Sequence, residues 1–284
     1  MWKIILLIIL AIAIAIIFAL VYGDIRWKSA TKDMHHRLEA ARISPPGQIY
    51  QIDELVGLPS PVQKYFRTVL QDGQPIVAAV TIAHKGTFNM SETGDNWKPF
   101  TSIQRVITQR PGFDWEARIH MAPGLVARVH DAYIAGEGIL HGSLFGLISI
   151  VKMMGTKEVA EGELMRFFAE TAWYPTALLP SQGVQWQAVS DSSARATLQD
   201  GDIVMTMLFR FNDDGLIESV YAEARGRTTG GSVIPTPWEG RWSNYEVRQG
   251  MLVPMQGEVA WVLPEGRKPY WRGRITSIQY EFLK

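Results

Sequence analysis

The sequence predicts an α+β protein: an N-terminal transmembrane helix, followed by a large curved antiparallel β-sheet, half-barrel-like, that packs on one or more helices. Three observations predict this fold. First, the chain begins with a long apolar stretch. Second, most of the chain after Pro75 alternates between apolar and polar residues with the period of a strand. Third, three other segments repeat apolar residues at helical spacing. Turn residues between successive strand segments predict hairpins, and consecutive hairpins form an antiparallel meander.

The N-terminal helix has the length of a membrane span. Ile4 to Tyr22 are nineteen uncharged residues, and at about 1.5 Å per residue they cover roughly 28 Å, close to the ~30 Å hydrocarbon core of a bilayer. A cleavable signal peptide is the alternative, because Lys3 is positive and Val21-Tyr22-Gly23 offers a cleavage position. The apolar stretch is longer than a signal peptide requires and carries the bulky Phe18 near its end, so we predict an uncleaved anchor at residues 1–23.

The charges that flank the span give conflicting indications of its orientation. Five basic residues follow it: Arg26, Lys28, Lys32, Arg37 and Arg42. The positive-inside rule favours the cytoplasm for this flank. The single Lys3 before the span is typical of an ordinary signal anchor, and the later domain resembles domains that work outside the inner membrane. We predict a single-pass protein of the inner (cytoplasmic) membrane with its domain on the extracytoplasmic side.

Composition limits the functional classes. The chain has 28 Lys and Arg against 28 Asp and Glu, without a run of like charges, which predicts no nucleic-acid partner. It has no Cys, which excludes disulfides, zinc thiolates and cysteine nucleophiles. Eight Trp between Trp97 and Trp271 supply material for a core. We expect a juxtamembrane helix and hinge at 24–49 and a single β-rich domain at 50–284.

Two helices are expected between the span and the first strand. From Asp24 to Arg42, one helical face is formed by Trp27, Ala30, Met34, Leu38 and Ala41. Ser44-Pro45-Pro46-Gly47 ends this helix and predicts a hinge. A second helix begins with Ser60 as N-cap and ends at Asp72-Gly73.

Strands are expected before and after a third helix. The first group is 75–90, 100–109, 113–121 and 126–135, and Gly136 to Met154 fits either a strand with a loop or a buried lid. The third helix has Thr156 as N-cap, ends at Trp173-Tyr174-Pro175, and should pack across the face of the sheet. The second group of strands is 184–189, 194–198, 203–211, 216–227, 238–248, 257–263 and 271–282.

The strand from Ile203 to Phe211 is apolar on both faces. Met205, Met207 and Phe209 lie on one of them. Such a strand suits a curved sheet whose concave side holds helices or a hydrophobic ligand.

Three short stretches carry a family resemblance: Trp173 to Ser181 (WYPTALLPS), Pro235 to Arg241 (PTPWEGR) and Tyr270 to Arg274 (YWRGR). With them the chain resembles an uncharacterised bacterial family of membrane-anchored proteins of unknown function, over most of its length after Leu58. No reaction is assigned to that family, so the resemblance implies no catalytic residue. The order of elements is loosely similar to the periplasmic lipoprotein-carrier fold, in which an antiparallel half-barrel holds acyl chains, and fold alone does not establish function.

Polar residues beside tryptophans in these stretches are the candidate ligand site. Glu239, Arg241 and Arg272 accompany Trp238 and Trp271 and could grip an anionic headgroup. The alternative is a cross-strand ion pair with a tryptophan stacked on a guanidinium. The predicted ligand-binding residues are Trp238, Glu239, Arg241, Trp271, Arg272, Met205, Met207 and Phe209.

Two other polar groups match no catalytic or metal motif. The first is His120, His130, Asp131, Glu137 and His141, whose spacing fits no metal-ligand pattern although His120 and His130 could be cross-strand neighbours. The second is Glu158, Glu161, Glu163 and Glu170 on the third helix, which with Arg166 is typical of a solvated, ion-paired helix face. We predict no catalytic residue, no metal site and no cofactor.

The leading functional hypothesis is a non-enzymatic, membrane-anchored domain that binds a hydrophobic or lipid-like ligand at the cell envelope. One alternative is an enzyme that acts on a membrane-associated substrate, which a convergent polar cluster inside a cavity would favour. The other is an envelope interaction scaffold whose helix from Asp24 to Arg42 pairs with another chain. The sequence leaves the oligomeric state open.

Overall fold

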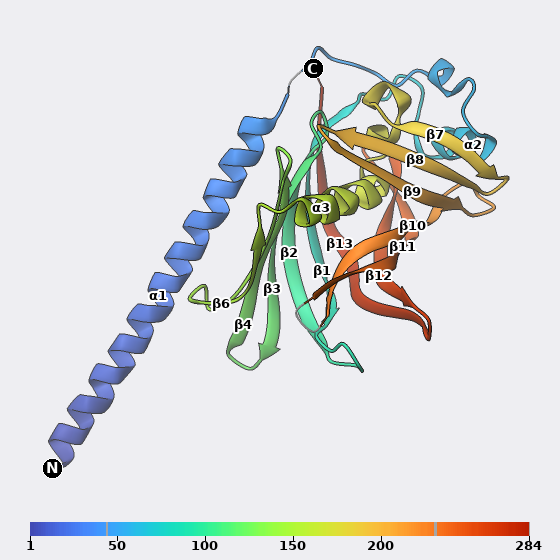
Figure 1. Ribbon diagram of the computed structural model, residues 1–284. Coiled ribbons are helices and arrows are strands. Elements are labelled where there is room, and N and C mark those ends of the chain that lie inside the picture. The colour runs from blue at the N-terminus through green and yellow to red at the C-terminus, as the bar shows by residue number, and fades with distance from the viewer. Residues whose placement is uncertain (44, 230–231, 284) are drawn as a thin grey trace.

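Thirteen strands form one open antiparallel sheet in the computed structural model, which describes residues 1–43, 45–229 and 232–283 (Figure 1). The strands are β1 (Val77–Asn89), β2 (Trp97–Ile107), β3 (Gly112–Ala122), β4 (Leu125–Ile134), β5 (Glu137–Leu144), β6 (Ile148–Met154), β7 (Gln185–Ser190), β8 (Ser193–Asp200), β9 (Ile203–Phe211), β10 (Ile217–Thr229), β11 (Ser232–Arg248), β12 (Met251–Leu263) and β13 (Gly266–Phe282). With its helices, this sheet confirms the predicted α+β class.

The sheet consists of two meanders joined along one strand pair. Its order is β6-β5-β4-β3-β2-β1-β13-β12-β11-β10-β9-β8-β7, so every neighbour except one is consecutive in sequence. The exception is β1 with β13, paired from Val77 with Phe282 to Phe88 with Trp271. The segment Gly136 to Met154, for which the sequence allowed two structures, contains the β5–β6 hairpin. Consecutive hairpins explain the topology, because each turn reverses the chain and places the next strand antiparallel beside the one before it.

Helices fill the inner face of the curved sheet. They are α2 (Ser60–Val69), α3 (Lys157–Ala169) and the short 3₁₀ helices η1 (Ile52–Leu55), η2 (Glu170–Trp173), η3 (Pro175–Leu178) and η4 (Pro180–Gln182). The hydroxyl of Thr156 accepts a hydrogen bond from Val159 N at 3.4 Å, which confirms Thr156 as the N-cap of α3. The N-cap of α2 is Pro59, one residue before the predicted Ser60, because Ser60 already has helical geometry.

A glycine lets α3 approach the sheet closely. A Cβ atom on Gly138 of β5 would lie 2.5 Å from the backbone of Val159 and Ala160, so a larger residue there would push the helix away. The position of α3 between the two meanders, plain in Figure 1, depends on this contact and on contacts with β4, β9 and β10.

The first helix, α1 (Trp2–Ala41), is continuous from the apolar segment through the predicted juxtamembrane helix. Its C-terminal half packs on the outer face of β2 to β5, where Met34 and Leu38 contact a cluster formed by Ala79, Ile107, Ala132, Ile134 and Ile139. The predicted apolar face from Asp24 to Arg42 is therefore covered by the chain's own sheet. Of the predicted hinge, Ser44 lies outside the described residues, and 45–47 contain no helix or strand.

The N-terminal half of α1 extends beyond the sheet without a partner (Figure 1). Among the described residues, α1 is the one helix that is long and apolar enough to cross a membrane, judged by length and composition. Its large apolar side chains from Ile4 to Val21 are exposed, which is the arrangement that a lipid environment would accommodate.

Candidate functional site

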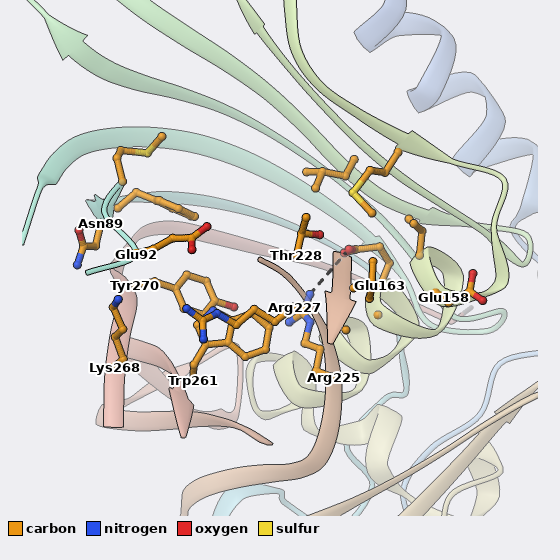
Figure 2. A pocket seen from close by; sticks show the side chains of 18 of the residues that line it. Asn89, Glu92, Glu158, Glu163, Arg225, Arg227, Thr228, Trp261, Lys268 and Tyr270 are labelled. Atoms are coloured by element: carbon orange, nitrogen blue, oxygen red, sulfur yellow. Dashed lines mark ion pairs between the residues drawn. The ribbon is translucent and has the colours of Figure 1, made fainter. Parts of the chain in front are cut away.

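A cavity of about 380 Å³, here called the inner cavity, lies on the inner face of the sheet beside α3 (Figure 2). The β1–β2 hairpin, β5 and β6, the first turns of α3, and the ends of β10 to β13 contribute its walls. Apolar side chains make up much of the lining: Phe88, Leu140, Met153, Val159, Trp261 and Tyr270. The wall is apolar because alternate residues of each strand point to the helix-covered face.

Charged side chains of both signs also border the inner cavity. Figure 2 shows Arg225 opposite Glu163, with 3.8 Å between the Arg225 guanidinium and Glu163 Oε1. The side chains of Arg227, Lys268 and Glu158 lie farther along the lining. A cavity with apolar walls and a few charged groups can hold an amphipathic molecule, because the charged groups orient the polar end of the ligand.

Behind Glu163, Arg166 of α3 connects three elements through a buried network. Its guanidinium bonds Glu170 Oε1 at 2.9 Å and Asp131 Oδ2 of β4 at 2.5 Å. Gln104 of β2 donates to Glu170 Oε2 at 2.6 Å. The guanidinium also lies 4.8 Å from the ring centres of Phe113 and Trp115. These contacts fix the orientation of α3 on the sheet, and hence the position of Glu163.

Glu163 and Asp131 form a carboxyl pair at the wall of the inner cavity. Burial raises the pKa of Glu163 well above its ordinary value, and the nearby charge of Asp131 raises it further, against the lowering effect of Arg225. Within the described residues, Glu163 Oε2 and Asp131 Oδ1 are buried and have no hydrogen-bond partner. The Arg225 guanidinium faces Glu163, while the Arg166 guanidinium pairs with the carboxylates of Asp131 and Glu170. Because its pKa is raised, Glu163 is the carboxyl group of this cluster that we expect to take up a proton most readily.

The substitution Glu163→Gln tests this protonation. A carboxyl group whose pKa is raised in the folded state stabilises the fold below its unfolded pKa, near 4.5, and loses this contribution as the pH rises through the raised value. Glutamine keeps the shape of the protonated acid and cannot ionise. We expect the variant to gain stability over the parent with rising pH, by at least about 1 kcal/mol at alkaline pH, measured by denaturant unfolding at a series of pH values.

The control for this measurement is Glu161→Gln, on the solvent side of the same helix, where Glu161 pairs with Lys157 at 3.5 Å. Stability curves of parent and Glu163→Gln that run parallel across the whole pH range would show that folding does not raise the pKa of Glu163.

Of the predicted ligand-binding residues, Trp238 lies just behind the wall of the inner cavity. Its Nε1 donates to the Tyr270 hydroxyl at 2.9 Å, Tyr270 stacks with Trp261, and the Arg225 guanidinium lies 5.5 Å from the Trp238 ring. Sequence reasoning did not identify Arg225, and it named Asp131 only as a member of the histidine group. A register shift between Ala222 and Arg225 in β10 interrupts the alternation from which the face of Arg225 could have been inferred.

The other predicted apolar residues lie elsewhere. Trp271 and Phe209 are buried in the core, where Trp271 packs near Phe100 and Phe209 near Phe168. The two methionines line a separate hollow of about 390 Å³ between β9, β10 and α3: Met205 and Met207. The predicted residues therefore do not converge on one site.

The predicted polar residues lie on the face of the sheet opposite α3. Arg241 and Arg272 border a broad hollow of about 940 Å³ there, together with Glu258. Arg272 pairs with its cross-strand neighbour Glu258 at 2.7 Å and lies 4.4 Å from the Trp97 ring centre. This is the ion pair with a stacked tryptophan that was the structural alternative. Glu239 pairs with Arg241 at 2.9 Å and with Arg267 at 2.5 Å.

The remaining polar groups differ from their sequence interpretation. Glu163 and Glu170 are only 6 % and 8 % exposed, so this part of α3 faces the sheet and is not a solvated helix face. His130 of β4 pairs with Glu116 of β3 on one side and with His141 of β5 on the other. His120 and His130 are therefore not cross-strand neighbours. His130 stacks against Trp27 beneath α1.

Comparison with known proteins identifies the family. A model of a family of unknown function, DUF6920, matches residues 56–280. The chain belongs to this family. The match confirms the resemblance carried by the three motifs, and its bounds place α1 outside the region that defines DUF6920.

Solved structures that match this DUF6920 member include a LolA superfamily protein from Nitrosomonas europaea. The sequence identity is 9 %, the TM-score is 0.41, and the match covers 79 % of this chain and 94 % of that chain. A search of curated proteins gives no match.

Proposed function

We propose that this DUF6920 protein is a membrane-anchored domain of the cell envelope that binds a hydrophobic or lipid-like ligand in the inner cavity. The observation that carries the proposal is the inner cavity itself, with apolar walls and the Glu163–Arg225 pair at one side. The long apolar helix α1 supports the anchoring. As part of the same proposal, the domain lies on the extracytoplasmic side of the inner membrane.

The size and the lining of the inner cavity fit an amphiphile. Its volume of about 380 Å³ lies within the ~300–1,000 Å³ that is usual for small-molecule sites. The apolar part of a ligand would lie against Leu140, Met153 and Trp261, and Arg225, Arg227 and Lys268 would attract an anionic headgroup. The hollow beside Arg241 and Arg272 is the less suitable site, because Arg272 pairs with Glu258 at 2.7 Å and Arg241 with Glu239 at 2.9 Å, both closer than the 3.8 Å between Arg225 and Glu163.

The experiment is native mass spectrometry of the complete chain in detergent micelles, followed by lipid extraction. The complete chain is required because α1 covers part of the sheet. We expect a stoichiometric apolar ligand on the parent. Leu140→Asp, which places a carboxylate on the apolar wall, should lower its occupancy about tenfold or more, since an unpaired charge beside an alkyl chain costs well over the ~1.4 kcal/mol of a tenfold change.

The matched control is Ile103→Asp, which makes the same kind of change on the exposed outer face of β2. Equal ligand occupancy in Leu140→Asp and Ile103→Asp would place the ligand elsewhere, and the hollow with Arg241 and Arg272 would then be tested by Arg241→Ala and Arg272→Ala. A parent chain that is folded and empty would contradict the proposal.

One observation favours a second candidate, an enzyme that acts on a membrane-associated substrate. The carboxyl pair of Asp131 and Glu163 is a polar cluster at a cavity wall, and a protonated carboxyl group there could act as a general acid. The mass spectra distinguish the two functions. If Glu163→Gln retains a ligand of different mass from the parent's, the cavity converts its ligand, and if both retain the same ligand the cavity only binds it.

A further inference from the structure

Two hairpin tips lie beside the end of the apolar half of α1. One is the β3–β4 tip, residues 121–126 (Met-Ala-Pro-Gly-Leu-Val), and the other is the β5–β6 tip, residues 144–150 (Leu-Phe-Gly-Leu-Ile-Ser-Ile). Neither tip contains a charged residue. Exposed hairpin tips in water are usually polar, so two apolar tips at one end of the sheet require an explanation.

Both tips contact α1 at the same level. Leu20, Gly124 and Phe145 surround a small hollow of about 200 Å³ between the helix and the tips. Gly23 and Gly146 bring the two backbones together, because a Cβ atom on Gly23 would overlap the Phe145 carbonyl oxygen and one on Gly146 would overlap the Gly23 carbonyl oxygen. The tips are therefore held beside the helix segment from Leu20 to Gly23.

That segment is where a membrane surface would lie. The uncharged stretch of α1 ends at Tyr22, so a bilayer that surrounds residues 4–22 has its interface beside both tips. Two apolar side chains of the second tip, at the start of β6, are exposed: Ile148 is 61 % and Ile150 is 51 % exposed. Lys152 follows on the same strand, and its positive charge would face the lipid headgroups of a bilayer placed at this level.

We propose that the two tips insert into the membrane interface next to the helix, so that the lipid surface covers them. The proposal rests on the proposed function, because the level of the bilayer is set by α1 as its anchor. The β5–β6 hairpin also contributes Leu140 and Met153 to the inner cavity. It thus provides an apolar route from the bilayer to the cavity, along which a lipid-like ligand can move without its apolar part crossing water.

The test uses the absence of native cysteine. Ala122→Cys and Ile148→Cys place single thiols at exposed positions of the two tips, and Val247→Cys is the control at an exposed valine of β11 near the β11–β12 turn. Each complete chain is labelled with an environment-sensitive fluorophore and reconstituted into phosphatidylcholine and phosphatidylglycerol vesicles. Half of the samples contain lipid with a doxyl quencher near the headgroup.

We expect blue-shifted emission and loss of most of the fluorescence to doxyl lipid at residues 122 and 148, and neither effect at residue 247. Equal, unquenched emission at all three positions would overturn the proposal. Carbonate extraction of the same vesicles shows separately whether the chain is membrane-integrated. A chain that resists extraction and carries its ligand, but whose tips are unquenched, leaves the proposed function standing and removes this inference alone.

Discussion

Replacement of Arg166 by methionine is expected to destabilise the protein by about 3–5 kcal/mol, because it leaves buried carboxylates without their partner. Arg166 is bonded to Asp131 and Glu170, and all three side chains are less than 15 % exposed. Methionine fills much of the same volume and can still contact Phe113 and Trp115. The expected loss of stability therefore comes mainly from the uncompensated charges of the carboxylates, and only to a small extent from a cavity.

The measurement is the free energy of unfolding of the complete chain in detergent, from denaturant titration followed by tryptophan fluorescence. The matched control is Arg195→Met on β8, where the arginine is half exposed and pairs with the exposed Glu223 at 3.4 Å. Such a pair contributes up to about 1 kcal/mol. A loss at Arg166 no larger than the loss at Arg195 would refute the central role of this network.

The network also shows why the candidate site could not be read from the sequence. The spacing of Glu163, Arg166 and Glu170 on one helix is the same whether that face meets water or a sheet, and solvent is the commoner case. The difference comes from β2 and β4, which bring Gln104 and Asp131 to the helix from 62 and 35 residues away. A local pattern carries no information about such partners.

The secondary structure, in contrast, follows from local signals. Alternation and turn residues predicted most strands, and the uncharged stretch predicted the exposed half of α1, because both depend on neighbours in sequence. The pattern from Gly136 to Met154 fitted two structures. The hairpin forms there because β5 pairs with β4 and because the hairpin contacts α3. The pairing of β1 with β13 likewise joins segments about two hundred residues apart and has no sequence signal.

The helix from Asp24 to Arg42 combines both cases. Its apolar face was correctly predicted, but the same face would suit another chain or the chain's own sheet equally well. In the structure the sheet covers it. Trp27 is 2 % exposed, stacks on His130 with ring centres 3.9 Å apart, and donates from Nε1 to Glu116 at 3.0 Å. This docking leaves the scaffold hypothesis without a free helix face.

Trp27→Ala is therefore expected to release the C-terminal half of α1 from the sheet, at a cost of about 3–5 kcal/mol in docking free energy. The indole is the largest group between the helix and β4, and its removal uncovers His130, whose pKa burial lowers to about 3. Hydrogen exchange of the amides from Trp27 to Leu38 measures the docking directly, because a detached helix end exchanges freely.

The control is Ile25→Ala on the same helix, where the side chain is 62 % exposed and should leave exchange almost unchanged. Equal protection in both variants would mean that the helix is held by its continuity with the apolar segment and not by the sheet. The outcome also bears on the proposed membrane contact of the hairpin tips, because the tips lie beside Leu20 and Gly23 only while α1 stays docked. Release of α1 should therefore lower the doxyl quenching at residues 122 and 148, because the two tips would no longer be held beside the helix segment from Leu20 to Gly23.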